Sequence, residues 1–202
     1  MSESVMFHDG NRRLQDEFDS RRIADRLVEK LTRFAFTDSD RRLIEGTMFF
    51  FLATADDRGR PDCSFKGGQP GFVRVVGENE LVFPDYDGNG MFKSLGNITV
   101  NPGVGLLFID MGEKPRRLRV NGTAKVSRDD PLMQRFAGAQ LLVRVKAQAI
   151  FPNCPRYIVR PGSEEPSKYA PRPDYTPPEP AWKNFDDFRD YIHPRQETPN
   201  GE

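Results

Sequence analysis

The sequence predicts a mainly β fold, in which an antiparallel barrel or sandwich carries a few accessory helices. The middle of the chain divides into about six short apolar segments, and turns rich in Gly and Pro separate them. The later segments alternate apolar with polar residues, as strands with one buried face do. Short strands in series, with few helical segments between them, are typical of antiparallel barrels and sandwiches.

The first four predicted strands lie at residues 47–55, 61–66, 72–76 and 80–84. The turn DRG at 57–59 separates the first two, and GGQPG at 67–71 precedes the third. Two later strands alternate most clearly, and their apolar positions are Leu118, Val120, Gly122, Ala124 and Val126, then Leu141, Val143, Val145, Ala147 and Ala149. The residues between them are mostly polar, so each of these strands should have one wet face.

Residues 1–45 form a predicted N-terminal helical extension. Between Leu14 and Phe34 the apolar residues recur mostly at steps of three to five, which indicates an amphipathic helical region. Thr37 and Asp40 have the spacing of a capping box, and Gly46 is a plausible stop. A short second helix at residues 38–45 should therefore lead into the core, which we place at residues 46–160.

The last segment, residues 161–202, is predicted to be a Pro-rich C-terminal arm. Seven of the seventeen prolines lie between Pro161 and Pro180, which favours an extended chain. Four aromatic residues follow at helical spacing, namely Trp182, Phe185, Phe188 and Tyr191. Because these side chains need a surface to pack on, we expect a docked arm.

Charge and hydropathy exclude several classes of partner. The 30 Lys and Arg residues balance 30 Asp and Glu residues, so the chain lacks the positive field that non-specific nucleic-acid binding uses. The longest apolar run, residues 48–53, is far shorter than the ~20 residues that span a bilayer. With no signal-peptide core at the start, we expect a cytoplasmic protein without a nucleic-acid or membrane partner.

The few cysteines and histidines limit the chemistry. Cys63 and Cys154 lie in segments that look buried or strand-like, without Cys-x-x-Cys spacing, and reduced thiols are expected in a cytoplasm. His8 and His193 lie near opposite ends of the chain. We therefore expect neither a His-based triad nor a His-rich metal site.

Three short stretches carry candidate ligand-binding groups. The stretch DYDGNGMFKS at residues 85–94 is a Gly-rich turn that opens a short helix, where free N–H groups, Lys93 and Ser94 could bind phosphate. Ser64 and Lys66 share one face of a strand, and RRLR at 116–119 places three cations before another. Each also has a plainer interpretation, as an ordinary turn or as solvated surface charge.

Taken together and in order, these stretches resemble the pyridoxamine 5'-phosphate oxidase-related flavin-nucleotide-binding proteins. The resemblance covers about residues 36–160 and rests on FFLATA at 50–55, GRPDCSFKGG at 59–68, LVFPD at 81–85, NPGVGLLF at 101–108, RLRVNG at 117–122 and FPNCPRY at 151–157. It implies an antiparallel split β-barrel that binds FMN. The implied FMN-binding residues are Ser64, Phe65, Lys66, Phe83, Pro84, Asn89, Lys93, Ser94 and Arg117.

The resemblance also implies roles for these residues. Lys66 is the expected phosphate partner on the first flavin-binding strand, with Lys93 and Ser94 gripping the phosphate from a helix. Phe83 and Pro84 occupy the second flavin strand, and Arg117 would stabilise negative charge on the reduced ring. No side chain is assigned a catalytic role, because the flavin itself exchanges the hydride. Tyr86 and Tyr157 are candidate proton donors, although packing aromatics are the commoner use.

The expected function is an FMN-dependent oxidoreductase that acts on a small molecule. The tail matches no pyridoxal-recognising segment, so pyridoxamine phosphate oxidation itself is not expected. The alternatives are a non-catalytic flavin carrier and a deazaflavin- or haem-using relative on the same fold. The resemblance further implies a homodimer with FMN at the interface. Residues 49–51 and 104–109 are apolar enough for such an interface, and equally for a barrel core.

Overall fold

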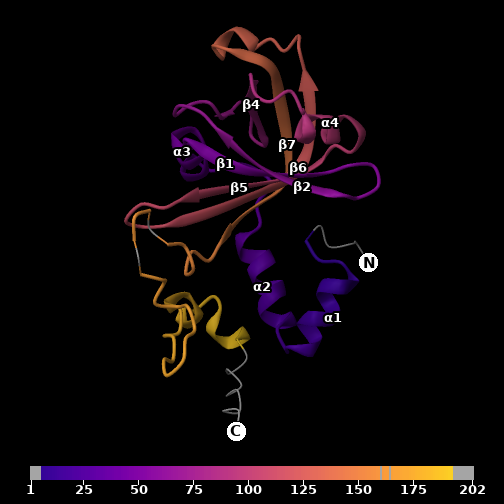
Figure 1. Cartoon of the computed structure of the whole chain (residues 1–202). Coiled ribbons are helices and arrows are strands. Elements are labelled where there is room, and N and C mark those ends of the chain that lie inside the picture. The colour runs from indigo at the N-terminus through magenta and orange to yellow at the C-terminus, as the bar shows by residue number, and fades with distance from the viewer. Residues whose placement is uncertain (1–5, 160, 164, 193–202) are drawn as a thin grey trace.

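The computed structural model describes residues 6–159, 161–163 and 165–192, and its centre is one seven-stranded antiparallel sheet (Figure 1). The strand order is β2-β1-β5-β6-β7-β4-β3, so β2 and β3 are the two edges. The strands are β1 Phe49–Ala55, β2 Pro61–Gly67, β3 Arg74–Val75, β4 Glu80–Tyr86, β5 Gly103–Asp110, β6 Arg116–Ser127 and β7 Ala139–Asn153. The predicted mainly β, antiparallel fold is confirmed.

The sheet curls into a split barrel around an aromatic centre. Three strands separate β1 from β4 in the sheet, yet the rings of Phe50 and Phe83 lie only 5.0 Å apart. Phe50 also packs against Phe108 of β5, at 5.2 Å between ring centroids. All three rings are completely buried. Such contacts across the sheet require strong curvature, and the apolar residues of 49–51 and 104–109 therefore divide between this core and the outer surface.

Alternation predicted the long strands well. In β6 the residues Leu118, Val120, Gly122 and Ala124 are buried, while Arg119 and its like-facing neighbours are exposed or half-buried. The register between β6 and β7 shifts at Asn121/Gly122, as in a β-bulge. A Cβ atom on Gly122 would lie 2.1 Å from the Lys146 carbonyl oxygen, so only glycine fits this close approach.

The third strand is shorter than predicted. A strand was expected at residues 72–76, but only Arg74 and Val75 pair with β4. Phe72 and Val73 are buried in the core without belonging to a strand. The apolar side chains of Phe72 and Val73 therefore indicate burial in the core, and the strand pairing that we expected for these residues does not form.

Four α-helices accompany the sheet: α1 Asp9–Glu17, α2 Arg21–Leu31, α3 Asp38–Gly46 and α4 Lys93–Val100. The predicted amphipathic region is two helices, because Asp19 between them adopts a left-handed φ of 45°. The capping box is confirmed: Thr37 Oγ1 accepts from the Asp40 amide at 3.1 Å, and the Thr37 amide donates to Asp40 Oδ2 at 3.0 Å. Ile44 of α3 and Leu95 of α4 enter the barrel core.

The C-terminal arm docks on α2. Asp187 bridges Arg26 and Lys30 at 3.2 and 2.8 Å, and the Arg26 guanidinium lies over the Tyr191 ring. The four aromatic residues do not form one helix: Trp182 and Tyr191 lie in two short 3₁₀ turns, Ala181–Asn184 and Arg189–Tyr191, and Phe185 and Phe188 lie between these turns. In Figure 1, α1, α2 and this arm lie together on one side of the barrel.

The two cysteines are free thiols. Cys63 lies in a strand, β2, which was one of the two expected environments, and its side chain is exposed there, while Cys154 is half-buried. His8 caps α1, and His193 lies outside the described residues. Within the described part of the chain, no helix is both long enough and apolar enough to span a membrane.

Candidate functional site

One wall of the site is the edge strand β2. Its side chains alternate, so Asp62, Ser64 and Lys66 lie half-buried on one face, while Cys63 and Phe65 are exposed on the other. Within the described sheet β2 pairs only with β1, with Ser64 opposite Leu52. The free edge leaves main-chain donors and acceptors of β2 beside Ser64 and Lys66.

A second wall is the loop between β4 and α4. The pairing of β4 with β7 becomes irregular between Asp85 and Tyr86, and the chain then turns through Gly88 and Gly90. Gly90 has a φ of 73°, which suits glycine, and the Met91 amide donates to Asn89 Oδ1 at 3.0 Å. This loop delivers the chain to the start of α4.

The first turn of α4 forms the floor. Its N-cap residue Phe92 is left-handed, with a φ of 46°, and no side chain caps the helix. The first amides of α4 therefore have no side-chain acceptor and point from the positive end of the helix dipole. Lys93 and Ser94 occupy this turn, as the sequence predicted for an anion-binding helix start.

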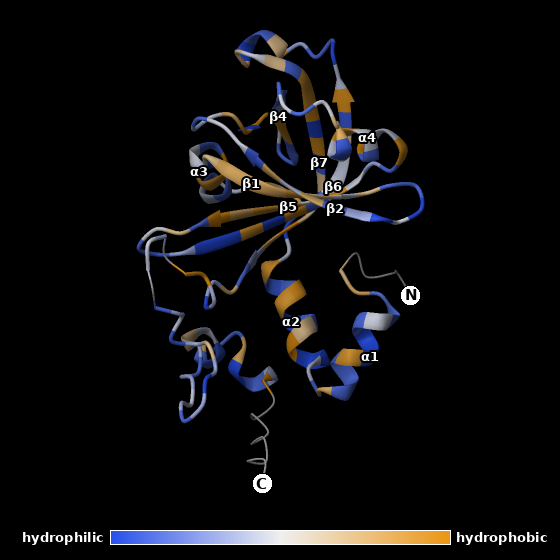
Figure 2. Ribbon diagram, viewed as in Figure 1, coloured by the Kyte–Doolittle hydropathy of each residue, from blue (hydrophilic) through white to orange (hydrophobic). Residues whose placement is uncertain are grey.

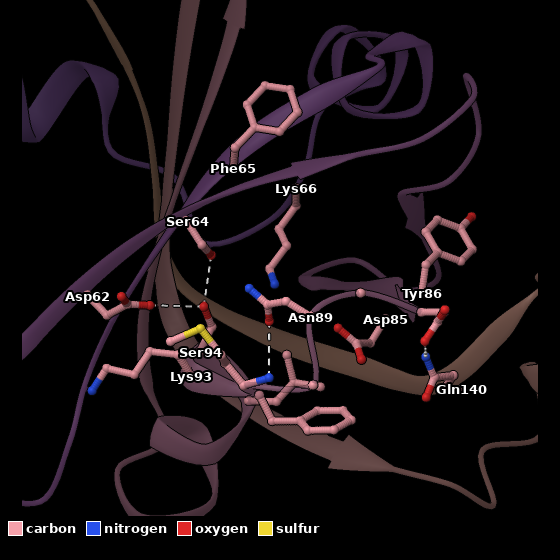
Figure 3. A pocket seen from close by; sticks show the side chains of 16 residues that line it. Asp62, Ser64, Phe65, Lys66, Asp85, Tyr86, Asn89, Lys93, Ser94 and Gln140 are labelled. Carbon is pink, nitrogen blue, oxygen red and sulfur yellow. Dashed lines mark hydrogen bonds between the residues drawn. The ribbon is translucent and has the colours of Figure 1, made fainter.

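Together these elements enclose a pocket of about 590 Å³, within the size range of small-ligand sites. Figure 3 shows its side chains. The lining residues are Asp62, Ser64, Phe65, Lys66, Asp85, Tyr86, Asp87, Gly88, Asn89, Gly90, Met91, Phe92, Lys93, Ser94, Leu95 and Gln140. Six of the nine predicted FMN-binding residues are among them, namely Ser64, Phe65, Lys66, Asn89, Lys93 and Ser94.

The side chains of these six point in different directions. In Figure 3 the Lys66 amine points into the pocket, toward Asn89 and Asp85. Lys93 extends away from Lys66, and the Phe65 ring points to the opposite side of β2. There Phe65 stacks on Phe49, with 5.3 Å between ring centroids. Phe65 thus borders the pocket mainly through its backbone and presents its ring to the surface.

Hydrogen bonds order two parts of the pocket. Ser94 Oγ donates to Asp62 Oδ2 at 3.0 Å and lies 2.8 Å from Ser64 Oγ. On the other side, Gln140 Nε2 donates to Asp87 Oδ1 at 3.5 Å. The first set ties β2 to α4, and the second ties the loop after β4 to β7.

Asp85 is the electrostatically unusual residue of the pocket. Burial raises the pKa of its carboxyl, and the positive charge of Lys66 opposes this rise. Its Oδ2 atom is buried without a hydrogen-bond partner in the structure. A buried carboxylate oxygen without a donor is costly, so Asp85 either carries a proton or receives a donor from a ligand.

The other three predicted residues lie elsewhere. Phe83 is fully buried in the barrel core, and Pro84 is buried beside it. Arg117 lies at the start of β6, opposite Asn153, where it donates to the Cys154 carbonyl. Burial there lowers the pKa of the Arg117 guanidinium, with further lowering by Arg119. The pocket of one chain therefore does not include these three side chains.

Four polar residues of the pocket were not among the predicted site residues, namely Asp62, Asp85, Asp87 and Gln140. Asp62 was detectable, since it shares the strand face of Ser64 and Lys66. Asp85 and Asp87 lie in the stretch 85–94, which was recognised by its glycines, Lys93 and Ser94 and not by its carboxylates. Gln140 had no local signal, because only the pairing of β4 with β7 brings it to the loop.

The donor set suits a flavin nucleotide better than a metal. Two lysines and an uncapped helix start provide cationic and amide donors for a phosphate. Tyr86, Met91 and Phe92 provide partly exposed apolar surface at the rim for a ring system. Among the described residues, no group of three or more His, Cys, Asp or Glu side chains is placed to bind a metal ion.

The fold and the pocket define a split β-barrel with a pocket lined by cationic, carboxylate and apolar side chains. The sequence model of the pyridoxamine 5'-phosphate oxidase family matches residues 36–165, which is more than half of the chain. The chain belongs to this family. The comparison with curated protein sequences found no match.

Several solved structures are distantly similar. HupZ of Group A Streptococcus is 19% identical, with a TM-score of 0.46 over 58% of this chain and 93% of that one. An FMN-binding protein of Syntrophomonas wolfei is 12% identical, with a TM-score of 0.47 over 72% and 96% of the two chains. HutZ, the heme storage protein of Vibrio cholerae, is 21% identical, with a TM-score of 0.42 over 56% and 91%.

Proposed function

We propose that this protein binds FMN in the pocket between β2, the loop after β4 and α4, and acts as a flavin-dependent oxidoreductase on a small molecule. The observation that carries the proposal is the convergence of six predicted flavin-binding residues on one pocket. These residues come from stretches up to about thirty positions apart in the sequence, at 64–66 and 89–94. The family match over residues 36–165 supports the same assignment.

The phosphate of FMN would bind at the start of α4. Uncapped amides and the helix dipole favour an anion there, and Lys93 adds a full positive charge. Lys66 approaches the same pocket from β2 and would neutralise the rest of the charge. Both lysines are flexible point charges, which suits a phosphate with several oxygen acceptors.

A second copy of the chain would cover the ring. Exposed apolar residues lie near β2, with Met91 at the pocket rim at 71% exposure and Phe65 on the face of β2 away from the pocket at 62%. Phe65 also continues into an outer aromatic cluster, since its ring lies 5.3 Å from Phe49 and 5.9 Å from Phe51. An exposed aromatic cluster on the outer face of β2, the strand that walls the pocket, favours a homodimer that completes two equivalent sites. In this dimer, Arg117 of the second copy would reach the flavin site.

Bound flavin would supply the hydride chemistry. The residues of the chain would position it, exclude water and adjust its charge. Asp85 is the group best placed to hold a proton beside the ligand, because burial raises its pKa and its buried oxygen lacks a partner. Tyr86 borders the same wall and is partly exposed, so it could also exchange a proton with solvent.

Two alternatives remain as competing proposals. A flavin carrier would use the same pocket without turnover. Haem, or a deazaflavin, would be a different ligand for the same fold. Among the residues that the structure describes, the pocket lining contains neither His nor Cys, so a haem iron bound there would depend on Tyr86 or Met91. That donor set favours a flavin.

Titration of the protein with FMN tests the binding proposal. The change is Lys93→Ala, with Lys125→Ala as the matched control, because Lys125 is an exposed lysine of β6 outside the pocket. Loss of a charge-assisted phosphate contact should weaken binding by about one to two decades. Equal FMN affinities for the wild type and the Lys93→Ala variant would show that the phosphate does not bind at the start of α4.

Turnover is tested separately with the FMN-loaded protein. Rapid mixing with NADH or NADPH should bleach the flavin, and an added acceptor should restore its colour. Absence of bleaching with both nucleotides would favour the carrier. Sedimentation equilibrium of the same sample should give a dimer, and a 23.1 kDa species that keeps its FMN would exclude a shared site.

A further inference from the structure

A chain of three side chains, Asp62, Ser94 and Ser64, has a fixed hydrogen-bond direction. Ser94 Oγ donates its single hydrogen to Asp62 Oδ2 at 3.0 Å, because an ionised carboxylate only accepts. The 2.8 Å contact between the two hydroxyls therefore uses the hydrogen of Ser64. The hydrogen atoms of both hydroxyl groups are therefore used in hydrogen bonds among these three side chains.

The direction of these hydrogen bonds determines whether the three side chains present donors or acceptors to a ligand. Ser94 is only 4% exposed, so Ser64 is the hydroxyl that a ligand would meet. With its hydrogen directed at Ser94, Ser64 presents lone pairs, and Asp62 adds a negative charge beside them. A phosphate oxygen is itself an anionic acceptor and finds no donor here. A ligand hydroxyl can donate its hydrogen, and it finds an acceptor in the Ser64 oxygen.

We propose that Asp62 is a specificity-determining residue, which acts through Ser94 to make Ser64 a subsite for a hydroxyl group of the ligand. This rests on the proposed flavin binding and deepens it. FMN carries a polyol chain between its ring and its phosphate, and that chain supplies the hydroxyl donors. The phosphate is then held by Lys93, Lys66 and the amides of α4, and Ser94 positions Ser64 without contacting the phosphate.

The arrangement in the pocket agrees with this division. Figure 3 shows Ser64, Ser94 and Asp62 pointing toward one another, while Lys66 enters the pocket beside them. Asp62 and Ser64 come from β2, and Ser94 comes from α4. A purely structural tie between these elements would stabilise the fold equally well, so the test must measure ligand selectivity as well as stability.

Three flavins separate the contributions. Lumiflavin lacks both the polyol and the phosphate, riboflavin has the polyol alone, and FMN has both. The ratio of riboflavin to lumiflavin affinity reports the polyol subsite, and the ratio of FMN to riboflavin affinity reports the phosphate subsite. All three are measured with the full chain by flavin fluorescence, alongside a thermal melt.

Asp62→Ala frees the Ser94 hydrogen and removes the charge. We expect the riboflavin to lumiflavin ratio to fall by about two- to tenfold, the equivalent of one hydrogen bond, and the FMN to riboflavin ratio to rise. Ser64→Ala should lower the first ratio similarly. Asp62→Asn keeps an acceptor for Ser94 without the charge, so it should preserve the first ratio and raise only the second. Asp57→Ala, an exposed carboxylate outside the pocket, is the control.

The outcomes are distinct. Unchanged ratios in Asp62→Ala and Ser64→Ala would overturn the inference and leave flavin binding intact, even where the melting temperature falls. If Asp62→Ala does not fold, Ser64→Ala and Asp62→Asn still decide the matter through the same ratios. If the wild type binds none of the three flavins, the proposed function fails, and this inference fails with it.

Discussion

The barrel buries large apolar side chains completely, whereas neither α1 nor α2 contains a buried residue. In Figure 2 the apolar colour is concentrated in the strands of the barrel and follows one stripe along α2. The barrel is held by packing of rings such as Phe50, Phe83 and Phe108. The appendages are held by ion pairs, including those of Asp187 with Arg26 and Lys30, which are worth little at an exposed surface.

This difference indicates two levels of stability. The barrel should unfold as one cooperative unit, because its core joins residues from every strand of the sheet except β2. The arm and α1 to α2 should open separately at lower free energy, as segments with few buried contacts do. The pocket belongs to the barrel, so flavin binding should persist when the appendages are loosened.

The largest expected effect is that of Phe50→Ala. Phe50 is fully buried and its ring lies within 6 Å of Phe72, Phe83 and Phe108, with the longest centroid distance at 5.9 Å. The lost transfer energy and the cavity should lower the free energy of unfolding by about 3–5 kcal/mol. Chemical denaturation measures it. A loss below about 1 kcal/mol would contradict a packed aromatic centre.

Gly122→Ala should come next, at about 3 kcal/mol, the upper end of the usual range for overpacking. The added Cβ would lie 2.1 Å from the Lys146 carbonyl oxygen, which is backbone and cannot rotate away. Gly46→Ala is the control, because nothing lies within 4 Å of its added Cβ. Denaturation midpoints compare the two, and equal midpoints would show that the bulge does not need glycine.

Phe188→Ala makes the same change as Phe50→Ala, but in the C-terminal arm and not in the barrel. Phe188 is largely buried and packs edge-on against Trp182, 5.8 Å between ring centroids. We expect the arm to detach while the barrel remains folded, with a loss of global stability below about 1 kcal/mol. Limited proteolysis should cut the arm faster. A loss equal to that of Phe50→Ala would make the arm part of the cooperative core.

Asp85→Asn should give the smallest change, in the pH dependence of stability. The raised folded-state pKa means that folded Asp85 keeps its proton at pH values where the unfolded group, with a pKa near 3.8, has lost it. The folded state then binds more protons, so the Asp85 contribution falls as pH rises through the folded pKa. Asp85→Asn should flatten this decline in melts above pH 4. If the pH dependence of stability is the same in Asp85→Asn and the wild type, the Asp85 carboxylate is solvated and its pKa is not raised by folding.

The sequence predicted the long strands and much of the pocket, for identifiable reasons. Strands β6 and β7 alternate because one face of each packs into the barrel, so the pattern is local. The loop from Asp85 to Ser94 was recognised because its glycines, Lys93 and Ser94 are contiguous. Ser64 and Lys66 share a strand face, which spacing alone specifies.

The differences between sequence and structure follow from non-local structure. Phe83 and Pro84 remain predicted flavin-binding residues, but in the structure both are buried, and the pocket begins at Asp85, beside the irregularity at Asp85/Tyr86. Gln140 reaches the pocket through pairing of distant strands. Strand β3 is shorter than predicted, because Phe72 and Val73 are buried without pairing to β4. In the arm, helical spacing of aromatic residues gave only single 3₁₀ turns.

Competition between FMN and haem tests most directly whether this pocket holds a flavin. Protein freed of bound ligand is incubated with equal excesses of FMN and haem, passed through a desalting column, and examined by its absorption spectrum. We expect the bands of oxidised flavin, at about one flavin per chain, and a colourless Lys66→Ala/Lys93→Ala double variant after the column. Retention of haem with no flavin, shown by a Soret band alone, would contradict flavin binding in this pocket.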